Sequence, residues 1–451
     1  MNIIIVGCGK VGSTIAKQLN AEGHNIVVVD NNPRPVEQIT ETLDVMGVEG
    51  NGATYKTLME AGVKVADLLI AVTAADELNL YCCFIAKCIG NLHTIARVRN
   101  PEYTVDLPLL KEELRLSMEI NPELTSAREM TKLLKFPGAI EIDTFSKGMV
   151  ELIKIRIDRD SPLAGKKILE TAKILKDKVK VCIVERGEEV FIPNGDFCIN
   201  EGDKISVIVQ SGEAQKVLKK LGIISGKSRN VIILGGSTTA YYLAKNLLQS
   251  GNNVKIIERN AQRCVELCEA LPNATIINGD AMDEELLLSE GIEYANGIAA
   301  LMDIDEENII VSLYAKSVSK AKIITKINTI AFDSIISNLA LDSVINPKHI
   351  TGEYIVRYVR AMQNSLGSNV ETLYKISDDK AEALEFRVRE HSPVTDIPIK
   401  DLKLKDNLQI ACINRQGKMF LPMGSDMIML HDTVIVITRH KGLNDLKDIL
   451  K

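Results

Sequence analysis

Residues 2–12 read NIIIVGCGKVG and residues 230–240 read NVIILGGSTTA, and these two stretches decide the fold. In each, an apolar run of strand length meets a glycine-containing turn that opens a helical pattern. Gly7 and Gly235, the first glycines of the two turns, are 228 positions apart. Later landmarks keep nearly the same spacing: Asp30 with Glu258, Asn51-Gly52-Ala53 with Gly279-Asp280-Ala281, Asn121-Pro122 with Asn346-Pro347, Ser161-Pro162 with Ser392-Pro393, and Pro193-Asn194-Gly195 with Pro422-Met423-Gly424. The chain therefore repeats one unit twice.

Each unit has two parts of different character. In the first part, Val/Ile-rich runs alternate with helical patterns such as residues 11–22, which predicts buried parallel strands in a βαβ order. These runs are Ile3–Val6, Ile26–Val29, Leu68–Val72 and Thr94–Val98. The second part, residues 150–222, contains the strand-like runs LIKIRI, VKVCIV and KISVIV, a glycine turn before EVFIP, and a helical stretch at 214–221. This part is typical of a small α+β domain.

The sequence thus predicts an α/β fold with two tandem Rossmann-like parallel-sheet domains, each followed by a small α+β domain. The expected ranges are 1–140 and 227–365 for the Rossmann-like lobes, and 141–226 and 366–451 for the small lobes. Gly226-Lys227-Ser228 is the expected linker. A chain of 451 residues is too long for one ordinary core, which agrees with several domains.

Composition argues against several classes of protein. The formal net charge is -6 and the basic residues are dispersed, so nucleic acid is not an expected partner. The apolar runs are shorter than the roughly 20 residues that a membrane-spanning helix needs. Residues 1–7 lack the features of a signal peptide. The nine cysteines, several of them inside apolar patterns, fit reduced thiols. We therefore expect a cytoplasmic protein.

The first glycine loop is the strongest candidate for a binding site. Gly7 permits a tight turn, Gly9 lets the backbone approach a pyrophosphate, and Gly12 allows close packing of helix on strand. The backbone N–H groups around Cys8, Lys10 and Val11 and the helix dipole then face the anion. These residues predict a phosphate-binding loop that needs no catalytic group.

Other residues complete the predicted first site. Asp30 lies 18 residues after Gly12 at a strand end, where a carboxylate accepts hydrogen bonds from ribose hydroxyls and repels a 2'-phosphate. NAD(H) or an adenine nucleotide is therefore favoured over NADP(H), although Arg34 leaves NADP(H) open. The ends of the next strands add residues to the same crevice, namely Asn51, Gly52, Thr73, Ala74 and Arg97, with Arg99 as an alternative to Arg97. Asp76 and Asn79 are read either as further site residues or as a helix cap and a solvated first turn.

The second copy of the loop departs from the pattern. It keeps the first glycine and has an acceptable Ala240 at the last position, but places Ser237 where a pyrophosphate needs bare backbone. An acidic residue remains at the ribose position and another at the third strand. The candidate residues of this second site are Gly235, Gly236, Ser237, Thr238, Thr239, Glu258, Gly279 and Asp280. We expect weaker or different binding there, and its occupancy stays open.

The whole pattern resembles the RCK (or KTN) family of regulators of potassium conductance in its tandem, TrkA-type form. Besides the first loop and Asp30, the residues that carry the resemblance are GNGATYKTLMEAGV at 50–63, AVTAADELN at 71–79, and both Ser-Pro-containing lobes. The resemblance covers essentially the whole chain, and these motifs are specific together, whereas the glycine motif alone is not. One departure is Asn51, where many single RCK lobes carry an Asp.

The resemblance implies a function. Each unit would have an amino-terminal lobe that binds NAD(H) or ATP/ADP and a carboxyl-terminal lobe of the TrkA_C type. The implied partner is a TrkH-type potassium-transporting membrane protein, which would hold the chain at the inner face of the cell membrane. Eight such lobes in a ring imply a homotetramer of tandem chains. Cyclic dinucleotides bind similar carboxyl-terminal lobes, so a second ligand there stays open.

Two other classes of protein fit the sequence less well. An NAD-dependent dehydrogenase would use the first Rossmann lobe, but the small repeated lobe after it leaves no catalytic domain. The six histidines do not cluster, and Cys264 and Cys268 have no neighbouring His or second Cys pair, so we expect neither a catalytic nor a metal site. A scaffold without a ligand leaves the first glycine loop and Asp30 unexplained. We therefore expect a regulator that is not an enzyme, in which different nucleotides stabilise different hinge angles.

Overall fold

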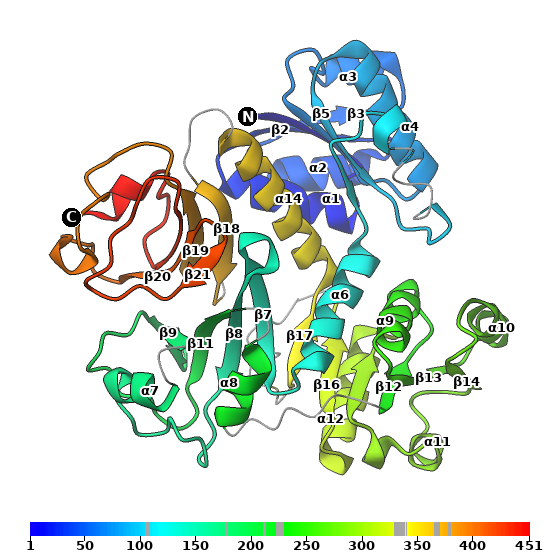
Figure 1. The fold of residues 1–451 in the computed structure, drawn as a ribbon. Coiled ribbons are helices and arrows are strands. Elements are labelled where there is room, and N and C mark those ends of the chain that lie inside the picture. Colours follow the sequence, from blue (N-terminus) through cyan, green and yellow to red (C-terminus); the bar gives the residue numbers. More distant parts are fainter. Residues whose placement is uncertain are drawn as a thin grey trace.

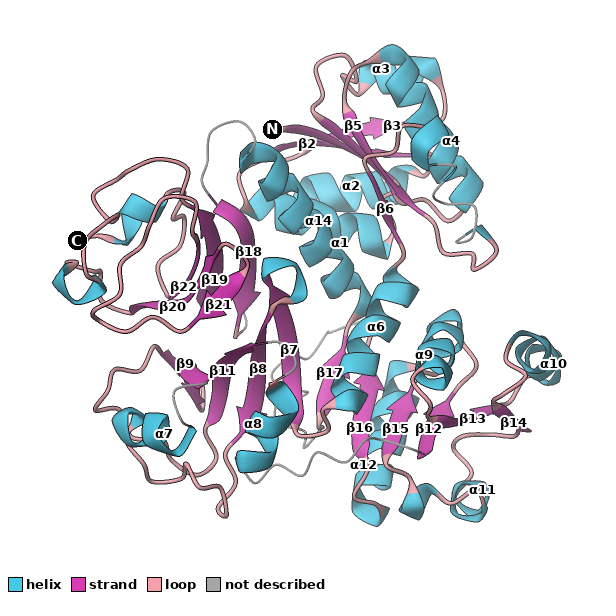
Figure 2. Cartoon of the chain, viewed as in Figure 1, coloured by secondary structure: helices cyan, strands magenta, loops and turns pink. Residues whose placement is uncertain are grey.

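The computed structural model shows two Rossmann-like lobes and two small lobes (Figures 1 and 2). It describes residues 1–451 except 104–108, 110, 176–178, 211–212, 222–229, 329–338, 340, 365–369 and 378–379. The predicted linker and the predicted boundaries near 226 and 365 lie outside the described residues. The predicted fold class is confirmed. The four residue ranges stay a prediction, and the boundary at 140 falls within a strand of the first small lobe.

The first Rossmann lobe is a six-stranded parallel sheet in the order β3-β2-β1-β4-β5-β6, with helices on both faces. The strands at residues 2–6, 25–30 and 68–71 read as nearly continuous apolar runs because both faces of the sheet are covered. The strands are β1 (Asn2–Val6), β2 (Asn25–Asp30), β3 (Met46–Glu49), β4 (Leu68–Ala71), β5 (His93–Arg97) and β6 (Met118–Ile120). The helices are α1 (Lys10–Ala21), α2 (Pro33–Thr42), α3 (Tyr55–Glu60), α4 (Asp76–Ile89) and α6 (Pro122–Lys135).

The first small lobe is a five-stranded antiparallel sheet in the order β10-β9-β11-β8-β7. It begins one strand earlier than the sequence indicated, because β7 precedes the predicted run LIKIRI. The elements are β7 (Ala139–Phe145), η1 (Ser146–Gly148), β8 (Val150–Arg156), α7 (Ile168–Leu175), β9 (Val179–Arg186), β10 (Glu189–Phe191), β11 (Lys204–Gln210) and α8 (Ala214–Lys220).

The second unit repeats both topologies, with the orders β14-β13-β12-β15-β16-β17 and β18-β19-β22-β20-β21. The Rossmann strands are β12 (Asn230–Leu234), β13 (Asn253–Glu258), β14 (Thr275–Asn278), β15 (Gly297–Ala300), β16 (Lys322–Lys326) and β17 (Ser343–Ile345). The helical elements are α9 (Thr238–Gln249), α10 (Ala261–Ala270), α11 (Glu284–Ser289), η2 (Ile292–Tyr294), α12 (Asp305–Val318) and α14 (Pro347–Asn364). The second small lobe contains β18 (Val370–Ile376), β19 (Ala381–Arg387), η3 (Ile399–Asp401), β20 (Leu408–Arg415), β21 (Lys418–Phe420), β22 (Thr433–Thr438) and η4 (Leu446–Ile449).

An ion pair between a partly exposed arginine and a buried aspartate recurs at the same place in both small lobes. Arg186 on β9 binds Asp203 through two hydrogen bonds of 2.9 and 2.8 Å, and Arg415 on β20 binds Asp432 with the same two lengths. Each aspartate is 1% exposed. Two parallel N–H···O bonds fix both groups, so the pair braces each sheet in the same way. The internal repeat is therefore confirmed down to individual side chains.

The last helix of each Rossmann lobe packs against the other lobe. Helix α6 lies along α9, and its Met130 belongs to one hydrophobic core with Leu243. Helix α14 lies along α1, where Ile355 and Val359 share a core with Leu19. Figure 1 shows α14 crossing from β17 to the first lobe. The exchange makes the two Rossmann lobes a pair within one chain.

The two small lobes pack face to face. Phe145 and Ile183 of the first share a hydrophobic core with Tyr374 and Ile437 of the second. The rings of Phe145 and Tyr374 lie 4.1 Å apart, centroid to centroid. Lys180 donates a hydrogen bond of 2.7 Å to the backbone oxygen of Ile410 across the same interface. The two small lobes therefore form a second pair within the chain, as the two Rossmann lobes do.

A mostly buried carboxyl group lies between α14 and the first small lobe. Asp143 on β7 is 19% exposed and its oxygen is 3.9 Å from the guanidinium of Arg357. The acidic groups that face it are Glu141 on its own strand, Glu353 on α14 and Glu129 on α6. Burial raises the pKa of Asp143 to about 8, with Glu141 adding to the rise and Arg357 opposing it. The folded chain therefore holds a proton that the unfolded chain releases in mild acid.

Replacing Asp143 by Asn is expected to remove a pH-dependent loss of stability. The unfolded carboxyl has a pKa near ~4, so between that pH and about pH 8 the free energy of unfolding of the wild type falls as the pH rises. In Asp143→Asn the fall should be smaller by several kcal/mol, since each unit of difference in pKa between the folded and unfolded states is worth about 1.4 kcal/mol. Urea denaturation of both proteins at mildly acidic and mildly alkaline pH measures the difference. Parallel pH dependences in the two proteins would show that Asp143 titrates normally.

Candidate nucleotide-binding site

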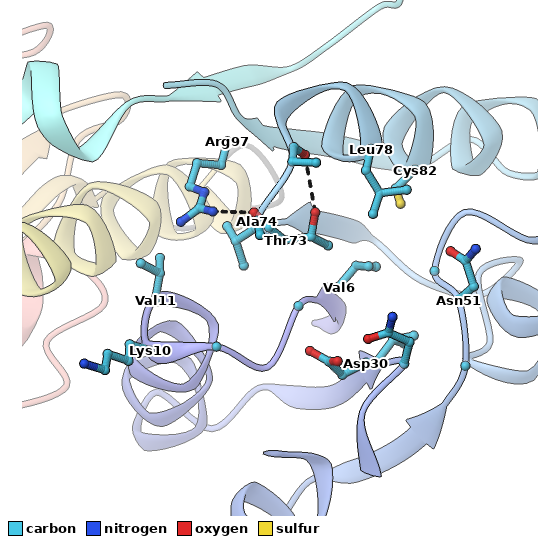
Figure 3. Close-up of a pocket in the computed structure, with 18 residues that line it drawn as sticks. Val6, Lys10, Val11, Asp30, Asn51, Thr73, Ala74, Leu78, Cys82 and Arg97 are labelled. Carbon is cyan, nitrogen blue, oxygen red and sulfur yellow. Dashed lines mark hydrogen bonds between the residues drawn. The ribbon is translucent and has the colours of Figure 1, made fainter. Parts of the chain in front are cut away.

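A cavity of about 450 Å³ lies at the carboxyl ends of the strands of the first Rossmann lobe (Figure 3). It sits where β1 and β4 meet and the strand order reverses, the usual ligand position in an open α/β sheet. The structure brings most of the predicted first-site residues to this cavity, namely Gly7, Gly9, Lys10, Val11, Asp30, Asn51, Gly52, Thr73, Ala74 and Arg97. Figure 3 shows Asp30 and Asn51 near one end, with Lys10 and Arg97 toward the other.

Two predicted residues do not line the cavity, and several lining residues were missed. The Cys8 side chain is 4% exposed and belongs to the core beneath the loop, and Gly12 lies against the backbone of Gly7. The missed residues are mostly apolar: Val6, Val29, Asn31, Gly50, Val72, Ala75, Leu78 and Cys82. Leu78 and Cys82 are four apart on α4 and so share one face, a spacing that could have indicated them.

The glycine loop has the geometry of a phosphate-binding turn. Gly7 has a φ of 103°, and a Cβ there would lie 2.9 Å from the backbone nitrogen of Thr73. A Cβ on Gly12 would lie 1.8 Å from the backbone oxygen of Gly7. A Cβ on Gly9 would meet no described atom within 4 Å, so this glycine borders open space. The loop therefore needs two of its glycines for its own packing and leaves the third free for a ligand.

The N-terminus of α1 is available to an anion. Gly9 is its N-cap residue, and no side chain in the described part of the chain caps the helix. The first N–H groups of a helix lack partners within the helix and carry the positive end of its dipole. A phosphate placed above Gly9 would satisfy these N–H groups.

Asp30 holds the loop and still faces the cavity. Its Oδ2 accepts a hydrogen bond of 2.7 Å from the backbone N–H of Cys8, and its Oδ1 accepts one of 2.9 Å from that of Asn32. A carboxylate offers about four acceptor positions, so about two remain for ribose hydroxyls. Burial, followed by the charge of Asp30, raises the pKa of the Cys8 thiol to about 12, which leaves that thiol unreactive.

A second layer of polar groups holds the far wall of the cavity. The guanidinium of Arg97 donates a hydrogen bond to the backbone oxygen of Thr73, and that of Arg99 donates one of 2.8 Å to the oxygen of Ala74. Arg97 lines the cavity and Arg99 does not. Burial, and then the charge of Arg99, lowers the pKa of Arg97, so an anionic ligand there would relieve both effects.

Of the two readings of Asp76 and Asn79, the helix cap with a solvated first turn is wrong, and neither residue lines the cavity. Asp76 is 7% exposed, and its carboxylate accepts hydrogen bonds from the backbone N–H groups of Arg99 and Asn100. Asn79 is 0% exposed and accepts a hydrogen bond of 2.7 Å from the N–H of Thr73. Both residues join α4 to the loops beside it, because the buried backbone groups there need partners.

The second copy keeps the loop but fills the anion position. Glu258 accepts a hydrogen bond of 2.5 Å from the N–H of Gly236, as Asp30 does from that of Cys8. The hydroxyl of Ser237 caps α9 by accepting a bond of 3.4 Å from the N–H of Ala240. Arg263 donates a bond of 2.8 Å to the oxygen of Gly236. A helix N–H that a phosphate would bind is thus already occupied, which favours weaker binding at this site.

The remaining second-site residues lie one position away from the predicted pairing, which matched Gly279 with Asn51 and Asp280 with Gly52. Gly279 follows β14 and donates a hydrogen bond of 3.0 Å from its N–H to the oxygen of Glu258, as Gly50 does to that of Asp30. Asp280 turns the chain by accepting a bond of 2.9 Å from the N–H of Met282, as Asn51 does from that of Ala53. Thr238 and Thr239 begin α9, and Thr239 is buried. Whether this second arrangement binds a ligand stays a prediction.

The described residues hold no group of three or more His, Cys, Asp or Glu side chains arranged to bind a metal ion. In the same part of the chain, every helix is too short or too polar to cross a membrane.

Fold and site together define a tandem Rossmann chain with a dinucleotide-type loop and paired small lobes. Two family models match it, each twice: the TrkA-N domain at residues 3–116 and 231–347, and the TrkA-C domain at residues 152–222 and 383–451. A Trk system potassium uptake protein TrkA homolog of Archaeoglobus fulgidus is 31% identical over the full length of both chains. TrkA of Halomonas elongata is 30% identical over 97% of this chain and 93% of its own. The chain belongs to the TrkA family.

Solved structures share the fold. The GsuK channel bound to NAD superposes with a TM-score of 0.64 at 16% identity, and the match covers 97% of this chain and 76% of that one. The isolated GsuK RCK domain gives a TM-score of 0.64 at 17% identity, covering 97% of this chain and 92% of that one. The arrangement of all four lobes is therefore that of an RCK fold.

Proposed function

We propose that this chain is a cytoplasmic, nucleotide-sensing regulatory subunit that gates a TrkH-type potassium-transporting membrane protein. The observation that carries the proposal is the uncapped N-terminus of α1 beside Asp30, in a cavity large enough for a nucleotide. Membership of the TrkA family supports the potassium system, because relatives of similar length are named as its uptake proteins. The chain would act at the inner face of the membrane through its partner.

The proposed ligands of the first site are NAD(H) and ATP or ADP. With its ribose on Asp30, a nucleotide would direct its phosphates toward Gly9, with Lys10 and Arg97 beyond. The carboxylate of Asp30 would repel a 2'-phosphate, which disfavours NADP(H). The GsuK channel is described with NAD bound, which agrees with this choice for the same fold. The first site is proposed to bind these ligands without chemical turnover.

A homotetramer is the proposed assembly. Two corresponding helices carry apolar side chains on their outer faces: Tyr81 and Phe84 on α4 are 51% and 42% exposed, and Ile310 on α12 is 56% exposed. Exposed apolar residues that cluster on one face mark an association surface. Sedimentation equilibrium would test this. We expect four chains in wild type and smaller species when Tyr81 and Ile310 are both replaced by Lys.

The first test of the proposed function is calorimetric titration with NADH, NAD, NADPH, ATP, ADP and AMP, with a parallel assay of nicotinamide turnover. Binding of NAD(H) or ATP/ADP without turnover would support a sensor. Steady oxidation of NADH would instead favour a dehydrogenase, and binding of none of these ligands would leave a scaffold. The stoichiometry per chain would also report whether the second site is occupied.

Asp30→Ala is expected to weaken nucleotide binding roughly tenfold to a hundredfold, since hydrogen bonds to a charged acceptor are worth about 1.5–3 kcal/mol. It also removes the acceptor for the Cys8 N–H, so a modest loss of stability is expected. Calorimetry with ADP would measure the change in affinity. Asp30→Asn, which keeps one acceptor oxygen, is the control and should retain more affinity than the Ala variant. Equal affinity in all three proteins would place the ribose elsewhere.

A further inference from the structure

Helix α1 joins the candidate nucleotide site to a buried charge network at its other end. It starts at the glycine loop, and its C-cap residue is Glu22. One carboxylate oxygen of Glu22 accepts a hydrogen bond of 2.8 Å from Nε of Arg360, and a second from the same guanidinium. Its other oxygen lies 3.4 Å from Nζ of Lys375. We name Glu22, Arg360 and Lys375 the Glu22 network.

The Glu22 network ties together three separate parts of the fold. Glu22 belongs to the first Rossmann lobe, Arg360 to α14 and Lys375 to β18 of the second small lobe. Figure 1 shows α14 lying between α1 and β18. The side chains of Glu22, Arg360 and Lys375 are 15%, 13% and 25% exposed. Removing one partner from a mostly buried ion pair is costly, so these elements are held together at this point.

The network continues into the sheet of the second small lobe. Lys375 lies directly opposite Glu382 on β19. Glu382 is 5% exposed, and burial raises the pKa of its carboxyl while the charges of Arg360 and Lys375 oppose the rise. Displacement of Arg360 or Lys375 would therefore leave this buried carboxylate less well compensated. The arrangement of β18 and β19 is thus sensitive to the position of Glu22.

Along its length, α1 packs closely against α14. The two helices run in the same direction, with the loop end of α1 beside the start of α14 and Glu22 beside Arg360. They approach closely at Gly352, where a Cβ would lie 1.8 Å from the side-chain oxygen of Gln18. Close-packed interiors transmit displacements rather than absorb them. A shift of α1 caused by a ligand at Gly9 would therefore reach Arg360 and Lys375.

The second unit has no charged counterpart of this network among its described residues. The spacing of the repeat puts Ser250 in the place of Glu22, Lys135 in that of Arg360 and Thr144 in that of Lys375. The hydroxyl of Ser250 donates back to the oxygen of Asn246 in its own helix. Lys135 is exposed, with its ammonium 5.5 Å from the centroid of the Phe136 ring. Only the first nucleotide helix is thus tied to a small lobe by buried charges in the described chain.

We propose that Glu22, Arg360 and Lys375 are positioning residues that transmit the nucleotide state of the first site to the second small lobe. The response of the chain is therefore one-sided: α1 carries it to β18 and β19, whereas α9 has no equivalent link to the first small lobe among the residues that the structure describes. This inference rests on the proposed nucleotide binding at the first site. To that proposed function it adds the residues through which the response passes and the difference between the two units.

The test is hydrogen–deuterium exchange of the full chain, without nucleotide and with saturating ADP or NADH, in wild type and in Glu22→Gln. In wild type we expect bound nucleotide to change exchange at β18 and β19 by about fivefold or more. In Glu22→Gln, calorimetric affinity for ADP should stay within about threefold of wild type, and protection of the glycine loop should persist. The change at β18 and β19 should be lost.

Ser250→Ala, at the counterpart position, is the matched control and should keep the full response. Lys375→Met, which removes only the longer contact, is the second variant if Glu22→Gln fails to fold, and it should lose the response in the same way. If Glu22→Gln lowered protection equally with and without nucleotide, the network would only stabilise the fold, and the inference would be overturned. Nucleotide binding by the wild type without any change in exchange at β18 and β19 would also overturn it. No binding of ADP or NADH by wild type would overturn the proposed function itself, and this inference with it.

Discussion

Gly9→Val is expected to abolish nucleotide binding while leaving the empty protein folded and close to wild type in stability. The backbone at Gly9 has a φ of -66° and a ψ of -176°, a conformation that any residue can adopt. An added Cβ would meet no described atom within 4 Å, and Gly9 lines the cavity, so we expect the valine side chain to extend into the cavity. There it would occupy the space above the α1 N-terminus, where a phosphate has to lie. We expect a loss of roughly 100-fold or more, or about 2.7 kcal/mol.

Calorimetry with ADP and NADH measures this loss, and urea denaturation of the empty protein measures stability. Valine is a poorer N-cap residue than glycine, so a cost of up to about 1 kcal/mol in stability is allowed for. Ser237→Gly tests the opposite change at the second site, because it removes the hydroxyl that caps α9 and should strengthen binding there. Unchanged affinity in Gly9→Val would mean that the ligand does not use this loop.

Gly7→Ala is expected to destabilise the protein whether or not a nucleotide is present. Gly7 has a φ of 103°, which disfavours any residue with a Cβ, and the new methyl group would lie 2.9 Å from backbone atoms of Val72 and Thr73. Those atoms belong to the chain just after β4 and have little freedom to move. We expect the free energy of unfolding to fall by about 2–4 kcal/mol. Urea denaturation of the empty protein measures the fall.

Gly9→Ala is the matched control, since it adds one methyl group to the same loop at a position that faces open space. Gly235→Ala should behave like Gly7→Ala, because Gly235 has a φ of 96° and its Cβ would lie 2.9 Å from the nitrogen of Met302. If Gly7→Ala and Gly9→Ala proved equally stable, the loop would not have the conformation described here.

Much of the fold was predictable because the signals are local and occur twice. Strand length, glycine turns and helical spacing depend on residues close in sequence, and their recurrence 228 positions later doubled the information. The same holds for most of the first site, since Gly9, Asp30 and Thr73 follow strands whose ends meet at one edge of a parallel sheet. The apolar wall of the cavity was missed, because Leu78 and Cys82 look like ordinary core residues of a helix.

Polar residues were harder to interpret than glycines. Asp76 and Asn79 stand in the first turn of α4, where a solvated position is the ordinary expectation, yet both are buried and bind backbone groups of neighbouring loops. The partners of Asn79 lie up to 18 positions away, and those of Asp76 lie 23 and 24 away. A pattern within one helix does not contain this information.

The sequence by itself determined that the chain is a doubled Rossmann unit with a nucleotide loop that is intact in the first copy and altered in the second. These features follow from backbone conformation and from residues adjacent in the chain, so short stretches of sequence are enough to predict them. Only the tertiary structure decided that α6 and α14 exchange lobes, that the small lobes pair, and that Glu22 meets Arg360, 338 positions later. The physical reason is that an apolar helix face or a buried charge is stable only when another group packs against it or neutralises it. Which group does so depends on how the whole chain packs.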